Sequence, residues 1–405
     1  MKFLHVGDLH LGKFFHERSL IEDQQHMLNQ LTQELITDQS PSSDNSSGNY
    51  QALIIAGDVY DRAVPPPEAV ALFDVFLSNL RKNLPELHII IIPGNHDSGR
   101  RLAFAASMLK FQKVHIASTA QDILQPVVID SVAFYSVPFM NPNFFGDGQT
   151  HQQSMVQTAV QQILQYHKTN YPQLAKVLVA HLFTQGSIPS DSERIFIGTA
   201  ELIDGNIFRD FDYVALGHLH RCQNPGKNLW YSGSPLAYSF SESENNNCFL
   251  KVELNLQDTD TTKTQSQINN LFQINVEKIP VNPLHKVCRL QGKFEDFYLD
   301  SENKFSKYKD CYLEITSTDS QLKENPIILL QTRYPYLLSY HQDFARANAS
   351  SVTMEQRREL LQGAEESRYP TAEIFTAFVE DIYQVLPENF DEELDLFKKI
   401  LEENK

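Results

Sequence analysis

The sequence is poor in cysteine and has no long apolar run. Its 405 residues include 4 cysteines, at positions 222, 248, 288 and 311, and no two of them stand in a CxxC spacing. This pattern favours isolated reduced thiols over a zinc knuckle or a disulfide framework. No apolar run approaches the roughly 20 residues that span a membrane, and the N-terminus lacks the apolar stretch of a signal peptide. We therefore expect a cytoplasmic protein without a membrane partner.

Basic residues are outnumbered by acidic ones. The chain has 34 lysines and arginines against 51 aspartates and glutamates, which gives a net charge of −17. Residues 341–405 hold 7 basic and 15 acidic residues, so a net of −8 lies at the C-terminal end. A protein that coats nucleic acid without sequence preference is normally basic, so this balance argues against that class. It leaves room for an enzyme that acts on nucleic acid, because bound metal ions or a basic partner can reverse the local field.

Short apolar runs rich in valine and isoleucine alternate with helical patterns up to about residue 255. Buried strands are expected at residues 3–6, 52–56, 89–92, 132–137, 177–180, 213–216 and 249–254. Apolar residues with helical spacing lie between Leu20 and Leu35, after the prolines at 65–67, and from Met155 to Tyr166. In the second of these helices, Val70 is expected on the buried face with Phe73. Strands that alternate with helices predict an α/β core of layered architecture.

The rest of the chain predicts two further parts. Strands at residues 287–292, 312–317 and 337–340, with helices at 294–305 and 325–332, indicate a small α+β unit. The predicted domains are therefore residues 1–279, 280–342 and a helical tail at 343–405. The tail has an apolar face from Ile374 to Leu386, which must pack on something because so small a helical pair cannot bury both faces alone. The polar segments 38–49 and 258–270 are expected to be loops.

Polar clusters directly follow five of the predicted strands. They are Gly7-Asp8-Leu9-His10, Gly57-Asp58-Val59-Tyr60-Asp61-Arg62, Gly94-Asn95-His96-Asp97, His181 and Gly217-His218-Leu219-His220. In open α/β sheets the carboxyl ends of the strands line the ligand crevice, so these residues are expected to converge. The glycine that begins four of the clusters lets the backbone turn sharply at the strand end.

The clusters supply carboxylate and amide oxygens and imidazole nitrogens, and no thiol. Such ligands suit manganese, iron, zinc or magnesium rather than a thiophilic ion. Seven or eight of them exceed the needs of one tetrahedral site and fit two adjacent ions. Two ions about 3.5–4 Å apart can activate a water and hold the attacking and leaving oxygens of a phosphate.

The ordered motifs DxH, GDxxD, GNHD, a single strand-end histidine and GHxH resemble the calcineurin-like metallophosphoesterase superfamily. The context is similar to the SbcD family, the nuclease subunits of bacterial SbcCD complexes, which are related to Mre-type DNA repair nucleases. The segments that carry this likeness are DLHLG at 8–12, GDVYDRAVPP at 57–66, GNHDS at 94–98, IFIGT at 195–199, DYVALGHLHR at 212–221 and YSGSPLAYSF at 231–240. The resemblance implies a layered β-sandwich core of α/β/β/α type, a DNA-binding capping domain and an ATPase-docking tail.

The resemblance also implies roles for individual residues. The metal ligands would be Asp8, His10 and His220 for one ion, Asn95, His181 and His218 for the other, and Asp58 as the bridge between them. His96 would not be a ligand but would stabilise or protonate the leaving group, a contribution of about 10²–10⁴-fold for a general acid. The side chain of Asp61 would either hydrogen-bond His96 or cap a helix.

The activity implied by the resemblance is hydrolysis of DNA phosphodiesters by a metal-activated water. The enzyme would be a double-strand exonuclease and a single-strand or hairpin endonuclease. Its cofactors would be two divalent metal ions, with manganese (Mn2+) preferred. Its partners would be an SbcC-like coiled-coil ATPase, double-stranded and hairpin DNA, and a second copy in a homodimer within a heterotetramer.

Two other functions stay open on the sequence alone. A phosphoprotein phosphatase or cyclic-nucleotide phosphodiesterase on the same scaffold usually lacks an extra capping unit and an acidic tail. A non-catalytic scaffold should have lost ligands, whereas all seven positions here carry metal-competent side chains. Outside the ligand set, Asp97 is expected to stabilise a turn and His5 to pack in the core. Arg100 and Arg101 either contact a phosphate backbone or lie at a solvated helix start.

Overall fold

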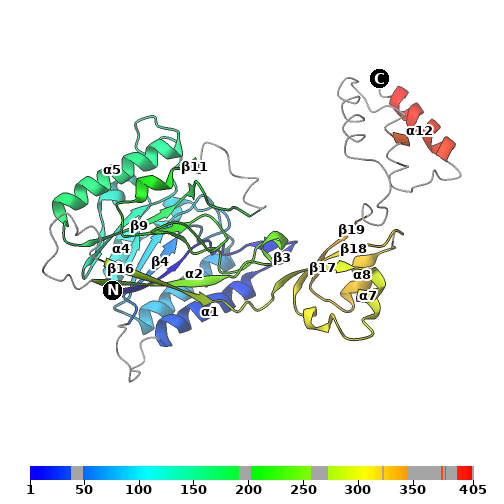
Figure 1. Cartoon of the computed structure of the whole chain (residues 1–405), viewed down its shortest axis with the longest axis horizontal. Coiled ribbons are helices and arrows are strands. Elements are labelled where there is room, and N and C mark those ends of the chain that lie inside the picture. Colours follow the sequence, from blue (N-terminus) through cyan, green and yellow to red (C-terminus); the bar gives the residue numbers. More distant parts are fainter. Residues whose placement is uncertain are drawn as a thin grey trace. The chain divides into compact units, whose positions relative to one another are not determined.

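The computed structural model describes residues 1–37, 49–190, 202–256, 272–321, 323–343, 375–376, 379 and 390–403. It divides into two units, Met1–Cys288 and Arg289–Lys405 (Figure 1). The three predicted domains, with boundaries at 279–280 and 342–343, stay a prediction, but the chain just after residue 280 is tied to the first unit. After strand β16 ends at Pro280, the backbone N–H of Asn282 still donates to Gln30 and that of His285 to Asp23, both 3.0 Å long and both within the first unit.

Several expectations lie outside the described residues. These are the loop at 38–49 except its last residue, the loop at 258–270, the IFIGT segment at 195–199, and most of the helical tail at 343–405 with its apolar face at 374–386. Among the helices in the described part of the chain, none has the length and apolar character needed to cross a membrane.

Two six-stranded sheets form the first unit. In the first sheet the order is β16 (Phe272–Pro280), β15 (Cys248–Leu256), β1 (Lys2–Val6), β4 (Ala52–Ala56), β5 (His88–Ile92) and β6 (Val114–Ile116). In the second it is β13 (Gln223–Gly226), β14 (Leu229–Tyr231), β12 (Tyr213–Gly217), β9 (Ala175–His181), β8 (Val132–Val137) and β7 (Val127–Ile129). Strands β1, β4, β5 and β6 are parallel, as are β14, β12, β9 and β8, so the carboxyl ends of each set lie at one edge.

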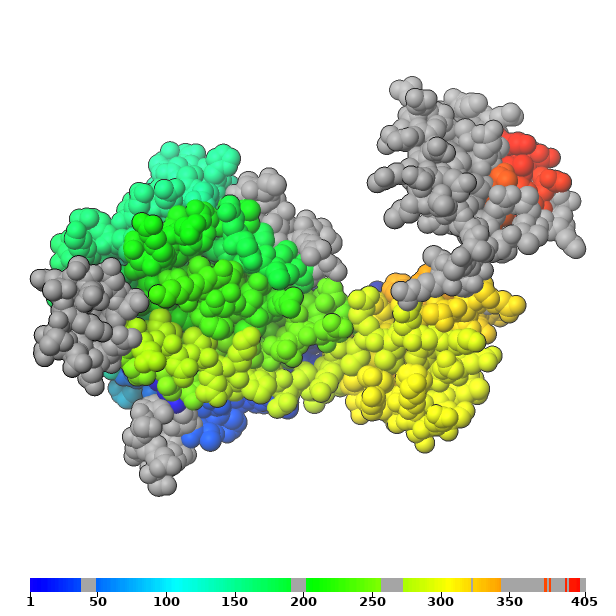
Figure 2. All heavy atoms as spheres, viewed as in Figure 1, coloured from blue at the N-terminus to red at the C-terminus, as the bar shows by residue number. Residues whose placement is uncertain are grey.

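The core of the first unit lies between these sheets and under the covering helices. Apolar side chains of β1 and β4 pack against those of β8, β9 and β12, and the Phe3 ring contacts Phe134 and Tyr213 edge-on at 5.5 Å. On the other face of the second sheet, residues of α5 (Gln152–Asn170) such as Met155 and Ile163 complete a separate cluster. Figure 2 shows α5 in turquoise forming the outer surface on that side and α1 (Ile21–Thr37) in blue on the opposite side. This α/β/β/α layering confirms the predicted fold.

The second long helix, α2 (Pro67–Asn83), begins at a proline as predicted, because proline lacks the N–H that the first helical turn cannot use. It buries Ala69, Phe73, Phe76 and Leu80. Val70 is 45% exposed, so its assignment to the buried face is wrong. The face runs through position 69, and the next residue of a helix lies about 100° around the axis.

The second unit contains a three-stranded sheet in the order β17 (Val287–Gly292), β18 (Tyr312–Ser317) and β19 (Leu337–Gln342). Its helices are α7 (Phe294–Leu299), α8 (Pro326–Gln331) and α12 (Phe390–Glu403). The helix predicted at 294–305 ends at Leu299 because Asp300 takes a left-handed conformation with φ 40°. Buried Phe297, Leu313 and Tyr334 form the core, and the Tyr334 hydroxyl donates to the Phe297 carbonyl at 3.1 Å.

Shorter elements complete the described chain. They are β2 (Phe14–Phe15), β3 (Arg18–Ser19), β10 (Phe183–Thr184), β11 (Leu202–Ile203), α3 (Gly99–Leu102), α4 (Ala106–Leu109), and the 3₁₀ turns η1 (Lys110–Gln112), η2 (Ala120–Leu124), η4 (Gly205–Phe208), η5 (Phe240–Glu242) and η7 (Ser306–Tyr308).

Candidate metal centre

The polar clusters meet where the parallel strands of the two sheets end. The Asp8 N–H donates to the Gly57 carbonyl at 3.0 Å and the His10 N–H to the Asp58 carbonyl at 2.9 Å, so the chains leaving β1 and β4 continue side by side. His181 is the last residue of β9 and reaches the other sheet, because its Nδ1 contacts the Ala56 carbonyl at 2.8 Å. The strand ends of both sheets therefore contribute to one site.

Four residues of the site adopt left-handed backbone conformations. The φ angles are 54° for Asp8, 43° for His10, 47° for Asp58 and 103° for His218. Residues with a side chain rarely occupy this region, and the cost of doing so is of the order of 1 kcal/mol or more. Glycine would relieve the strain but would remove the ligand side chain. The surrounding hydrogen bonds, such as those from the Asp8 and His10 N–H groups, hold these residues in the strained conformation.

The chain segments that leave the strands, both within the first sheet and between the two sheets, approach so closely that a Cβ atom would collide at three of the strand-end glycines. A Cβ atom on Gly217 would lie 1.9 Å from the Ala56 carbonyl oxygen, and one on Gly94 would lie 2.1 Å from the Asp58 Oδ1. A Cβ on Gly57 would lie 2.1 Å from the His181 Nδ1. The glycines that begin these clusters thus permit backbone contact as well as a turn.

We expect Gly217→Ala to destabilise the protein and to disturb the site together. The added methyl group must push β12 away from β4, and overpacking of this kind typically costs about 1–3 kcal/mol of unfolding free energy. Thermal unfolding and Mn2+ binding measure the two effects. The matched control is Gly205→Ala, whose Cβ would meet nothing nearer than 3.5 Å and should change stability by less than about 0.5 kcal/mol. Equal stability of the two variants would contradict the close approach.

The predicted ligands of one ion converge on Asn95. Its Oδ1 lies 3.0 Å from the Nε2 of His181 and 3.0 Å from the Nδ1 of His218. Because the Nδ1–H of His181 donates to the Ala56 carbonyl, the Nε2, which faces Asn95, is the nitrogen of that ring that would bind an ion. One amide oxygen and two imidazole nitrogens are thus directed at one point.

The histidines of the other predicted set also face each other. The Nε2 atoms of His10 and His220 are 3.1 Å apart, and the Nδ1 of His220 contacts a buried carboxylate, Glu242, at 3.1 Å. Asp58 lies between the two sets, because its Oδ2 is 3.7 Å from the His10 Nε2 and 3.4 Å from the His181 Nε2. That position is the one expected of a bridging carboxylate.

Asp8 was predicted with His10 and His220, but it also lies close to His181 and His218 of the other set. Its carboxylate groups with Asp58 and His181, with ligand atoms within 4.8 Å of one another, and its Oδ1 accepts the N–H of His218 at 2.9 Å. The structure therefore brings all seven predicted ligands together, with Asp8 beside Asp58 and near histidines of both sets, His181 and His220.

An unpaired buried carboxylate oxygen is what a cation site would supply. Among the described residues of the centre, the Oδ2 of Asp8 is buried without a hydrogen-bond partner. Asp8 and Asp58 are 0% and 2% exposed, and buried carboxylates are costly unless a cation or donors compensate them. The donor set of oxygen and nitrogen fits divalent ions of the first transition row. When bound, such ions supply Lewis acidity and an activated water at neutral pH.

The same burial spreads the pKa values of the site. Burial raises the pKa of Asp8 to about 7 and lowers the pKa of His218 to about 3. Burial also opposes the charged forms of Asp58 and His181, but their mutual attraction outweighs it. This attraction holds the pKa of Asp58 well below its usual range and raises the pKa of His181 to about 9. Neighbouring groups with pKa values pushed this far apart are typical of functional sites.

His96 stands at the margin of this cluster, with Asp58 and His10 within 4.8 Å. Its backbone N–H donates to the Asp58 Oδ1 and its Nδ1–H to the Asp61 carbonyl oxygen, both at 2.9 Å. The expected contact between His96 and the Asp61 carboxylate is absent, because that carboxylate pairs with the Lys13 Nζ at 2.7 Å. Nor does Asp61 cap a helix, since α2 begins only at Pro67.

Two carboxylates support the ligands from outside. Asp97 accepts the backbone N–H groups of Gly94, Val59 and Tyr60 at 2.9–3.0 Å, which confirms it as a turn-stabilising residue. Glu242 was not predicted as a site residue. It lies beyond the last strand-end motif, and the only signal in the sequence is its place just after the YSGSPLAYSF segment.

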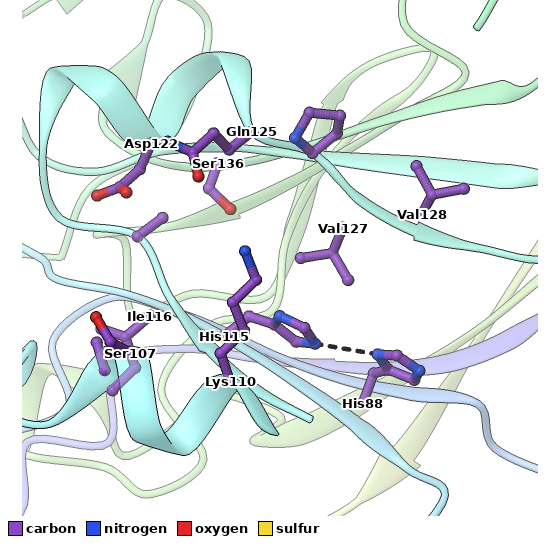
Figure 3. A pocket seen from close by; sticks show the side chains of 13 residues that line it. His88, Ser107, Lys110, His115, Ile116, Asp122, Gln125, Val127, Val128 and Ser136 are labelled. Atoms are coloured by element: carbon purple, nitrogen blue, oxygen red, sulfur yellow. Dashed lines mark hydrogen bonds between the residues drawn. The ribbon is translucent and has the colours of Figure 1, made fainter. Parts of the chain in front are cut away.

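Three histidines outside the ligand set lie away from the metal centre. His5 is fully buried, contacts the Tyr213 hydroxyl at 3.0 Å and has its pKa lowered by burial to about 3, which confirms it as a core residue. His88 and His115 stack in parallel beside a cavity of about 380 Å³, with ring nitrogens 3.1 Å apart (Figure 3). None of the predicted site residues lines this cavity, so it is separate from the metal centre.

Comparison with known proteins agrees with this geometry. Residues 1–222 match the calcineurin-like phosphoesterase family. The SbcD subunit of the SbcCD nuclease from Staphylococcus saprophyticus is 32% identical over 351 residues, and that from Staphylococcus epidermidis is 31% identical over 349 residues. Each alignment covers 84% of this chain and 84% of the relative. The chain therefore belongs to the calcineurin-like phosphoesterases and, within them, to the SbcD family of SbcCD nuclease subunits.

Proposed function

We propose that this chain is the Mn2+-dependent nuclease subunit of an SbcCD-like complex and hydrolyses DNA phosphodiesters with a water nucleophile. The main support is the convergence of seven oxygen and nitrogen ligands around Asp58, with His96 at the margin. The ligands would hold two divalent ions, and the second unit would cap the DNA.

The proposed role of His96 as a general acid follows from its hydrogen bonds. The Asp61 carbonyl accepts the Nδ1–H of His96, which fixes the ring and leaves Nε2 as the atom free to act on substrate. In the protonated ring, Nε2 donates its proton to the departing sugar oxygen, so that a hydroxyl leaves rather than an alkoxide. Lys13 neutralises the nearby Asp61 carboxylate and keeps it from competing for that proton.

A nuclease assay tests this function directly. Blunt and hairpin DNA duplexes are incubated with the full chain in Mn2+, Mg2+ or Zn2+, with and without the coiled-coil ATPase. We expect cleavage with Mn2+ and stronger cleavage with the ATPase, because the net charge of −17 limits DNA binding by the chain alone. Hydrolysis of an aryl phosphate monoester with no cleavage of DNA under any condition would instead show a phosphatase.

The ATPase-docking proposal concerns the tail at 343–405. In its described part, Phe397 stacks on Phe375 at 4.2 Å, while Leu396 and Ile400 of α12 are 60% and 50% exposed. An amphipathic helix with apolar residues left in solvent fits a hydrophobic partner groove. We place the contact with the coiled-coil ATPase on this segment.

The proposed homodimer has a candidate surface on the turn after α3, on α4 and on η1. Phe104, Met108 and Phe111 are 82%, 73% and 88% exposed, and all three lie within 8 positions of sequence. Large apolar side chains gathered on a surface mark interaction sites. A second copy would cover the same patch on its partner, because a two-fold interface is self-complementary.

Phe111→Asp is expected to convert the dimer to a monomer while Mn2+ binding persists. Sedimentation of both proteins over a range of concentrations measures the change. Val75→Asp is the matched control, since Val75 is a 53% exposed apolar residue of α2 that is not one of the three patch residues, and it should leave the dimer intact. A wild-type chain that sediments as a monomer throughout, or a Phe111→Asp variant that stays dimeric, would rule out this surface.

A further inference from the structure

The 3₁₀ turn η5 places a fully buried carboxylate behind one side of the metal centre. Glu242 has 0% exposure and accepts three hydrogen bonds. Its Oε1 lies 3.1 Å from the His220 Nδ1 and 2.8 Å from the Ser239 hydroxyl, and its Oε2 lies 2.9 Å from the Tyr238 backbone N–H. Both oxygens are therefore committed to donors, which fixes the orientation of the carboxylate.

This contact determines which nitrogen of His220 is protonated. A carboxylate accepts but cannot donate, so the Nδ1 of His220 must carry the proton and the Nε2 must carry the lone pair. That Nε2 faces the His10 Nε2 at 3.1 Å, inside the centre. The partner that a ligating histidine keeps on its other nitrogen sets its tautomer and ring orientation.

Glu242 reaches His10 as well, through Tyr238. The Tyr238 ring packs edge-on against His10 with centroids 5.4 Å apart and against His220 at 5.8 Å. Glu242 holds the backbone N–H of this tyrosine, and the tyrosine hydroxyl donates to the Leu9 carbonyl, next to His10. Glu242 thus contacts His220 directly, and it also holds Tyr238, whose ring packs on His10.

The opposite side of the centre is built differently. There the Nδ1–H of His181 donates to the Ala56 backbone carbonyl, and the Nδ1 of His218 faces Asn95. Glu242 takes part in neither of these contacts. The two sides therefore depend on different supports.

We propose that Glu242 is a positioning residue that orients His220, and through Tyr238 also His10, for only one of the two metal ions. The inference rests on the proposed function, since it concerns the same centre. It assigns a role to a residue that lies outside the metal-ligand motifs.

Glu242→Gln is a sharp test because glutamine keeps the size of the side chain but has only one accepting oxygen. If the amide oxygen faces His220, the amide N–H groups meet the Tyr238 N–H. If the side chain is flipped, they meet the His220 Nδ1–H. In the first orientation the Tyr238 backbone loses its acceptor, and in the second His220 loses its acceptor, so either orientation removes one of the two supports on the side of His10 and His220.

The experiment titrates the full-length, metal-free chain with Mn2+ by calorimetry. We expect two ions for the wild type. In Glu242→Gln we expect one ion bound as before and the other bound roughly 10–100-fold more weakly. At two equivalents of Mn2+, the electron paramagnetic resonance spectrum should change from that of a coupled pair to that of isolated ions. Glu314→Gln is the control, since Glu314 is 8% exposed and pairs with Arg289 at 2.8 Å in the second unit.

The outcomes separate this inference from the proposed function. A wild type that binds no Mn2+ would refute the metal centre itself. A wild type with two ions and an unchanged Glu242→Gln variant would overturn only the role of Glu242, as would equal weakening of both ions. If the variant does not fold, ¹⁵N NMR of the wild-type histidines decides, because the role requires His220 to carry its proton on Nδ1 and a proton on Nε2 would overturn it.

Discussion

Asp58→Ala is expected to lose metal binding and hydrolysis together. The Asp58 carboxylate is almost fully buried and lies between the two ligand sets, 3.4 Å from the His181 Nε2 and 3.7 Å from the His10 Nε2. Its removal leaves those imidazoles without the charge that offsets a pair of dications. Bound metals supply several kcal/mol of transition-state stabilisation, so kcat should fall by about 10³-fold or more.

The metal content of the purified variant and its cleavage of duplex DNA measure the two losses. Asp74→Ala is the control, because Asp74 is an exposed acid on α2 that should be silent in both assays. Full Mn2+ occupancy in Asp58→Ala would show that this carboxylate does not bridge the ions.

His96→Ala is expected to behave in the opposite way, keeping the metals and losing hydrolysis. The contact between His96 and Asp58 is made by the backbone N–H, which alanine retains, so the orientation of Asp58 is preserved. The side chain gives up its bond to the Asp61 carbonyl, its edge contact with the His10 ring and its place within 4.8 Å of Asp58. Loss of a general acid should lower kcat by about 10²–10⁴-fold.

Calorimetric titration with Mn2+ and single-turnover cleavage of DNA distinguish these effects. His115→Ala is the matched control, because this histidine is partly buried in the same unit but lines the separate cavity of Figure 3. If His96→Ala emptied one of the metal sites, His96 would be a ligand rather than an acid.

Much of the fold was predictable because buried strands and amphipathic helices each have a characteristic pattern of apolar residues in the sequence. The strands predicted at 52–56 and 132–137 have those bounds in the structure, since residues buried on both faces form uninterrupted apolar runs. Edge strands carry no such signal. β13 has the sequence Gln-Asn-Pro-Gly and β6 is only three residues long, and neither was predicted. Helix α7 was predicted too long because the prediction ended it at Phe305, whereas the backbone turns left-handed at Asp300.

The site was predictable for a related reason. Ligands placed directly after parallel strands must converge, so Asp8, Asp58 and His218 could be grouped from their positions alone. The partner of His96 could not, because a backbone carbonyl accepts that bond and any residue could supply it. Glu242 also escaped prediction, since it lies 22 positions after His220 and reaches it through a turn rather than a strand end.

The most direct test is a crystal of the full-length chain grown with Mn2+ and measured at the manganese absorption edge. The proposed centre predicts two anomalous peaks per chain, with Asp58 between them, His10 and His220 at one ion, and His181 with Asn95 at the other. No peak at this position, or peaks bound by other residues, would contradict it.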